Sequence, residues 1–109
     1  MKTLRLTAAE SRAYAAGERS FWRAMKPQPD EIEPGVWHWN GRGRGCFIST
    51  TFTLQTIGRR EEILPFCPYG TPGDRITLTH GLSRVTLPIT AITVTQRDGK
   101  WGWLVEVGA

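Results

Sequence analysis

The segment AGERSFWRAMKPQP, residues 16–29, holds the side chains of this sequence best suited to binding an anion. It contains one hydroxyl group, on Ser20, and three cations, Arg19, Arg23 and Lys26. Guanidinium and ammonium groups contact phosphate, and Phe21 or Trp22 between them offers a face on which a base can stack. Alternatively, the segment is a strand with solvated polar residues and core aromatics. Because successive strand side chains point to opposite faces, at least one of the two aromatics is then structural.

Residues 37–45, WHWNGRGRG, form a second basic segment, in which Arg42 and Arg44 alternate with glycine. Glycine leaves the backbone open and the guanidinium groups mobile, which suits sequence-tolerant contact with single-stranded nucleic acid. The competing interpretation is a solvated hairpin tip that follows a strand whose Trp37 and Trp39 share one face and fill the core.

The remaining chemically versatile groups are two histidines, two cysteines and Tyr69. The cysteines and histidines lack the Cys-x-x-Cys spacing of a structural zinc site, so the sequence predicts no metal and no cofactor. Histidine can serve as a general base near neutral pH, which makes His80 a candidate, although a lone histidine at a strand end is more often structural. We expect Tyr69, within the turn PYGTPGD, to line a cleft.

Length and charge limit the classes of protein to consider. The 109 residues fit one domain, residues 1–109, and eleven of the fourteen basic residues are arginine, within a net charge of +4. Arginine both forks onto phosphate and stacks on flat rings, so its excess favours a nucleic-acid or nucleotide partner. No apolar run approaches the roughly 20 residues that cross a bilayer, and the N-terminus lacks a secretory apolar core. We therefore expect a cytoplasmic protein with no membrane partner.

One helix and a set of short strands must position these residues. Residues 2–6 alternate like a strand, Thr7 and Glu10 form a capping-box pattern, and Gly17 is the expected end of the helix. Beyond it, Thr, Val, Ile and Trp with frequent Gly and Pro favour strands joined by turns. The candidate strands are GVWHW, CFISTTFTL, DRITLT at residues 74–79, and the two arms of a C-terminal hairpin.

The C-terminal hairpin can be given a register. Asp98-Gly99 is typical of a two-residue type I′ turn, and counting outward from it defines the strand face that should be buried. That face consists of Ile92, Val94, Trp103 and Val105. A change of parity near Ala91 predicts a bulge, with Pro88 on an edge or at the irregularity. These features favour an α+β fold, a small β-barrel of about five to six strands with one N-terminal helix packed at one end.

Two stretches of the chain resemble a known family. The first runs from the helix-ending Gly17 through ERSFWR to KPQP at residues 26–29, and the second is CPYGTPGDR at residues 67–75. Together they resemble the phage-encoded members of the ASCH group within the PUA-like superfamily, over about residues 3–80. The resemblance implies a PUA-like barrel in a phage protein of a bacterial host cell. It also implies a cleft between helix and strands for RNA or a modified nucleoside.

The resemblance separates a binding function from a hydrolytic one. Some ASCH relatives are amidohydrolases that act on acylated cytidine, with a lysine after the helix-ending glycine, a nearby threonine and a glutamate on a later strand as catalytic groups. At the matching positions this sequence has Arg19, Ser20 and His80. An arginine stays protonated and cannot serve as the base, so the sequence argues against hydrolysis.

The leading hypothesis is a non-catalytic module that binds RNA or a nucleotide-like ligand through a basic cleft. Its predicted contacts are Arg19, Ser20, Arg23, Lys26, Arg42, Arg44 and Tyr69. The alternative is an amidohydrolase in which Ser20 orients the reacting group and His80 replaces the usual acid. A small module that binds a host protein is the third hypothesis, and the oligomeric state stays open.

Overall fold

The computed structural model describes residues 2–26, 28–33, 36–39, 45–47, 50–53 and 67–108. One helix and nine strands lie within these ranges. In chain order they are β1 (Lys2–Arg5), α1 (Ala8–Ala15), β2 (Ser20–Ala24), β3 (Asp30–Glu33), β4 (Val36–Trp39), β5 (Gly45–Phe47), β6 (Thr50–Thr53), β7 (Arg75–His80), β8 (Ser83–Arg97) and β9 (Lys100–Val107).

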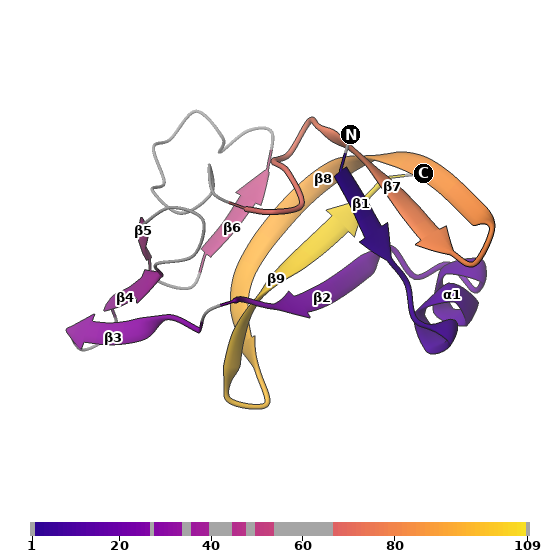
Figure 1. Ribbon diagram of the computed structural model, residues 1–109. Helices are drawn as coiled ribbons and strands as arrows, with labels where there is room; N and C mark the ends of the chain where they lie inside the picture. The colour runs from indigo at the N-terminus through magenta and orange to yellow at the C-terminus, as the bar shows by residue number, and fades with distance from the viewer. Residues whose placement is uncertain are drawn as a thin grey trace.

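Six of these strands form one mixed sheet, with the order β1-β7-β8-β9-β2 and with β6 paired to β8. β1 pairs with β7 in parallel, and the other pairs of this sheet are antiparallel. The sheet curls into a half-barrel, and α1 lies at the end where β1, β2 and the β7–β8 turn approach one another (Figure 1). β3, β4 and β5 form a separate three-stranded sheet. The expected α+β, barrel-like architecture with one helix is therefore confirmed within the described residues.

The β8–β9 hairpin has the predicted register. The turn residues Asp98-Gly99 have φ angles of 54° and 78°, as a type I′ turn requires. The expected buried face pairs Ile92 with Val105 and Val94 with Trp103. All four of these side chains are at most 1% exposed, so this part of the core is confirmed.

β8 bends where the sequence predicts an irregularity. Its register with β9 shifts between Ile89 and Ala91, and Ala91 and Ile92 are both buried although they are consecutive residues. A bulge has this effect, because one extra residue turns the side chains that follow to the other face. Pro88 lies directly before the shift, where it still pairs with Arg75 of β7. The bend allows β8 to pair with β7 in its first half and with β9 and β6 in its second half.

The core lies against one face of the main sheet. The DRITLT pattern predicts Ile76 and Leu78 on a common face, and both are buried together with Leu4 of β1, with which Leu78 pairs. Phe21 of β2 is 2% exposed and belongs to the same cluster. One of the two aromatics between the cations of residues 19–26 is therefore structural, as strand alternation predicts.

α1 begins and ends as predicted, yet none of its residues is fully buried. Thr7 caps the helix in a capping box with Glu10, and Gly17, with φ of 110°, follows the last turn. Its main apolar contact is Tyr14, which is partly buried against the core. Because the helix buries so little apolar surface, polar contacts must contribute much of what holds it to the sheet.

Gln28, within the KPQP stretch, contacts β9 beyond the end of β2. The side-chain nitrogen of Gln28, Nε2, donates to the backbone carbonyls of Met25, at 2.8 Å, and of Trp101, at 3.0 Å. Its side-chain oxygen, Oε1, accepts from the backbone amide of Trp101 at 2.8 Å. The Met25 amide also donates to the Trp101 carbonyl, at 2.9 Å, so Met25 and the Gln28 side chain together bind the Trp101 backbone. This explains how β9 remains paired past the end of β2.

No helix in the described ranges is long and apolar enough to span a membrane.

Candidate ligand-binding site

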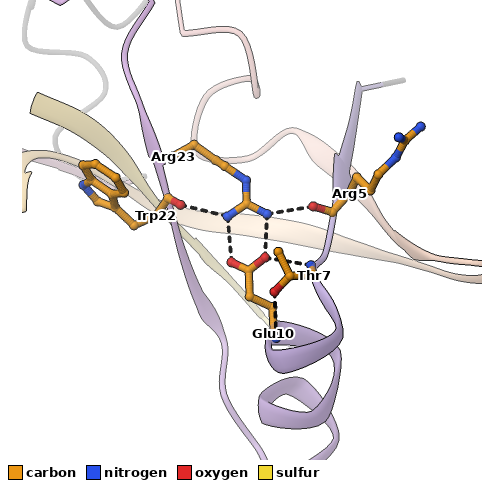
Figure 2. A network of polar contacts seen from close by, with 5 residues as sticks. All are labelled: Arg5, Thr7, Glu10, Trp22 and Arg23. Carbon is orange, nitrogen blue, oxygen red and sulfur yellow. Dashed lines mark hydrogen bonds and ion pairs between the residues drawn. The ribbon is translucent and has the colours of Figure 1, made fainter. Parts of the chain in front are cut away.

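Arg23, a predicted ligand contact, lies at the centre of a polar network between α1, β1 and β2 (Figure 2). Its Nη1 donates to Glu10 Oε2 at 2.6 Å and to the Trp22 carbonyl at 2.8 Å. Its Nη2 donates to Glu10 Oε1 at 2.8 Å and to the Arg5 carbonyl at 2.7 Å. Both side chains of the ion pair are only about a quarter exposed, at 23% and 24%. Four donor bonds of the guanidinium are therefore made within the protein.

The same carboxylate caps the helix. The Glu10 amide donates to the Thr7 hydroxyl at 3.1 Å, and the Thr7 amide donates back to Glu10 Oε1 at 2.9 Å. Burial raises the pKa of Glu10, but the hydrogen bonds and charge of Arg23 and the Thr7 amide outweigh it and leave this pKa below its ordinary value. We call this set, Thr7, Glu10 and Arg23 with the carbonyls of Arg5 and Trp22, the helix junction. It ties α1 to both neighbouring strands.

Arg19 lies at the other end of the helix. Its guanidinium stacks on the Tyr14 ring, 4.2 Å from the ring centroid, and donates to the carbonyls of Tyr14 at 3.0 Å and Glu18 at 2.9 Å. A cation near the last carbonyls of a helix is favourable for the helix dipole. The amides of Arg19 and Ser20 both donate to the Glu18 carboxylate, at 2.9 and 3.0 Å. The structure thus places Arg19 and Ser20 beside Glu18, with part of the Arg19 cation used in closing the helix.

Trp22 lies on the opposite face of β2 from Phe21. It packs over Gly102 of β9, where a β-carbon would overlap the indole ring, and Arg97 lies 5.5 Å from its ring centroid. A side chain at residue 102 would exclude the indole, which gives a physical reason for glycine there. The Trp22 ring, which is predicted to stack on a base, therefore contacts both strands of the β8–β9 hairpin.

The other predicted cations fall in two groups. Lys26 is exposed just after β2 and forms no ion pair with another described residue. Arg42 and Arg44 lie outside the described residues, so the glycine-rich loop stays a prediction from the sequence.

Tyr69 lines a surface hollow of about 440 Å³ together with Lys2, Gly70, Asp74 and Arg75. We call it the Tyr69 hollow. Lys2 Nζ lies 3.5 Å from the Cys67 carbonyl, and neither Lys2 nor Arg75 forms an ion pair with a described residue. Tyr69 and two cations thus line the same hollow, and the role of Tyr69 as a ligand contact stays a prediction.

The turn that carries Tyr69 is organised by Asp74. Its Oδ2 accepts from the Thr71 amide at 3.0 Å and from the Thr71 hydroxyl at 3.1 Å, while the Asp74 amide donates to the Thr71 carbonyl at 2.9 Å. Gly70 has φ of 108° and packs against the Asp74 carboxylate. Any residue with a β-carbon would be strained there. Asp74 is therefore a structural acid, and its carboxylate is already engaged by donors of the turn.

Burial raises the pKa of two titratable groups at this turn, Cys67 and Tyr69. Burial raises the pKa of the Cys67 thiol to about 11, so the thiol is protonated near neutral pH and does not act as a nucleophile. Burial also raises the pKa of Tyr69, although the nearby charge of Arg23 opposes this change. Arg23 and Tyr69, which the sequence predicts to share a cleft, are thus near enough to influence each other.

His80 lies away from the Tyr69 hollow, at the far end of β7. It lines a small pocket of about 150 Å³ whose other polar groups include Ser11, Tyr14 and Ser83. Tyr14 connects this pocket to Arg19, which stacks on its ring. Ser20 does not line the pocket, so the described contacts do not unite Ser20 and His80 in one site.

Sequence reasoning missed the cations that lie closest to the hollows. Lys2 and Arg75 flank Tyr69, while Arg5 and Arg84 line a further hollow described below. They meet because β1 pairs in parallel with β7, about 74 positions later in the chain. The available signal was the alternation of polar and apolar residues in residues 74–79, which puts Arg75 on the face opposite Ile76.

No protein-family model, curated protein or solved structure matches this chain. Within the described ranges, no group of three or more His, Cys, Asp or Glu side chains has a geometry able to hold a metal ion. What the described site offers chemically is an aromatic ring with adjacent cations, an arrangement suited to binding a flat, anionic ligand.

Proposed function

We propose that this protein is a PUA-like binding module for RNA or a nucleotide-like ligand. The observation that carries the proposal is the Tyr69 hollow, in which a half-buried aromatic ring lies beside Lys2 and Arg75. A base stacks on the ring of such a site while the cations contact its phosphate, and neither interaction requires a particular base. The volume of the hollow, about 440 Å³, is also in the range of small-molecule sites.

The charge distribution supports the same proposal. Only the Arg23–Glu10 ion pair occurs among the described residues, although the chain carries fourteen basic residues against ten acidic ones. Most described cations are therefore open to a ligand or to solvent, and an excess of this kind favours a polyanion. Lys26 belongs to this group, and we retain it among the proposed contacts.

Titration with a fluorescent, mixed-sequence RNA strand of about 12 nucleotides tests the proposal. We expect binding whose affinity falls more than about tenfold between about 50 and 200 mM salt, because contacts with about three phosphates release that many counterions. Replacement of Tyr69 by Leu should weaken binding by about 1–3 kcal/mol through lost stacking, whereas Tyr69→Phe should retain it. Absence of RNA and nucleotide binding at low salt would overturn the proposal.

A further inference from the structure

Arg5 and Arg84 face the same side of the main sheet, on two strands separated by β7. The register pairs Arg5 with Thr79 and Thr79 with Arg84, so the three residues form one row across β1, β7 and β8. Directly paired residues project from the same face. The next row has the same polarity and consists of Thr3, Thr77 and Thr86.

The opposite face of these three strands is apolar. Leu4 pairs with Leu78, and Ile76 pairs with Leu87, and all four are buried. The polar rows therefore cannot turn inward without exposing the core. We call their outward side the arginine face, defined by Arg5, Arg75 and Arg84 with Thr3, Thr77, Thr79 and Thr86.

The row of Arg5, Thr79 and Arg84 surrounds a second hollow. Its volume is about 450 Å³, and it is lined by Thr3, Arg5, Thr79, Gly81 and Arg84. No carboxylate lines it, and neither Arg5 nor Arg84 forms an ion pair with a described residue. In Figure 2 the Arg5 guanidinium extends away from the helix junction, although its carbonyl accepts from Arg23. Two hydroxyl groups and two guanidinium groups thus converge on one open space.

The spacing of the two cations suits an oxyanion. Adjacent strands lie about 4.8 Å apart, so the Arg5 and Arg84 backbones are separated by about 10 Å across Thr79. Two extended guanidinium groups can reach a common phosphate from either side at that separation, with the Thr79 hydroxyl as a further donor. The two guanidinium groups repel each other across β7, and an anion bound between them offsets this repulsion.

The arginine face continues to the Tyr69 hollow. Arg75 lies on the same side of β7 as Thr79, four residues earlier, or about 13 Å along the strand. Between them the Thr77 and Thr86 hydroxyl oxygens lie 2.9 Å apart. Arg75 also lines the Tyr69 hollow and so joins that hollow to the arginine face, whereas Lys2 of the hollow pairs with Ile76 and lies in a row of the opposite face.

We propose that the arginine face binds the phosphodiester backbone of a single nucleic-acid strand whose base occupies the Tyr69 hollow. Arg5 and Arg84 hold one phosphate beside Thr79, and Arg75 contacts the strand near the base. This inference rests on the proposed function and makes it more specific, because a mononucleotide is too short to reach both hollows. The natural ligand is therefore a polynucleotide strand.

The test compares two variants with equal loss of charge. Arg5→Gln combined with Arg84→Gln removes the proposed phosphate contacts, and Arg12→Gln combined with Lys100→Gln removes two exposed cations elsewhere. The probes are a uridine 12-mer, uridine monophosphate and a poly-glutamate peptide. Loss of the one phosphate that the two arginines hold should make the slope of log K against log salt less steep by about 0.7 for the 12-mer. Its affinity at low salt should fall at least about tenfold.

The arginine variant should bind uridine monophosphate like the wild type, and the matched control should keep the wild-type salt slope for the 12-mer. Equal slopes in the two double variants, with RNA binding by the wild type intact, would overturn the phosphate assignment alone. Absence of all RNA and nucleotide binding by the wild type would overturn the proposed function as well. Competition by poly-glutamate as strong as that by RNA would instead show an acidic-peptide surface and overturn the inference. Circular dichroism spectra confirm that each variant is folded before it is titrated.

Discussion

Arg23 in the helix junction and Arg5 on the arginine face carry the same side chain in different surroundings. Arg23 makes four hydrogen bonds, two of them to one carboxylate, and is about a quarter exposed. Arg5 is exposed and has no ion pair among the described residues, and only its carbonyl takes part in the junction. The two residues are joined by a hydrogen bond, yet of their two guanidinium groups only that of Arg23 forms an ion pair with a described residue.

This difference shows what a count of basic residues leaves out. A guanidinium whose donors are used by the fold contributes to stability, whereas one without a partner is available to a ligand. The segment of residues 16–29 contains the first kind at Arg23, and the arginine face contains the second kind at Arg5 and Arg84. The comparison predicts that loss of the guanidinium lowers stability at Arg23 and ligand binding at Arg5 and Arg84.

The largest expected effect is on stability after loss of Arg23. Arg23→Ala leaves Glu10 partly buried without its partner and should lower the free energy of unfolding by about 2–3 kcal/mol. Arg5→Ala should change it by less than about 0.5 kcal/mol, as is usual for exposed positions. Urea denaturation of the two variants measures both values. Similar losses for the two would contradict the distinction between the junction and the face.

The hairpin and the helix were predictable because their signals are local. Asp98-Gly99 specifies a turn type whose twist fixes the strand register, and the Thr7–Glu10 pair specifies where the helix begins. Counting residues outward from the turn then identifies the buried strand face. The attachment of the helix to the sheet was harder to predict, because no sequence pattern links Glu10 to Arg23 across the intervening turn.

The candidate site was predicted only in part, because its residues meet through long-range pairing. Tyr69 lines a hollow, but the cations of that hollow, Lys2 and Arg75, come from strands far apart in the chain. Parallel pairing of β1 with β7 has no local signal in either segment, unlike a hairpin. The sequence therefore identified the basic character of the protein more readily than the surface that displays it.

The capping box should have an intermediate effect on the helix junction. Thr7→Ala removes the hydroxyl that accepts from the Glu10 amide, and it should cost about 1 kcal/mol of stability. Thr7→Ser keeps the hydroxyl and should stay near the wild type. Chemical denaturation distinguishes the two. If Thr7→Ala were as stable as Thr7→Ser, the ion pair to Arg23 would be sufficient to hold Glu10, and the cap would not contribute to the junction.

The smallest of the three effects is expected in the pH dependence, because burial of Glu10 opposes its favourable contacts. Its pKa in the folded protein lies below the ordinary value of 4.5. The unfolded chain therefore binds this proton more readily, and the stabilisation is complete above that value and lost as pH falls through the folded pKa. Glu10→Gln keeps a capping side chain but cannot titrate. Between about pH 6 and pH 3.5 the wild type should thus lose more stability than Glu10→Gln in urea denaturation. If the two proteins lost the same unfolding free energy over this pH range, the negative charge of Glu10 would not stabilise the helix junction. Glu10 would then hold Arg23 through hydrogen bonds alone.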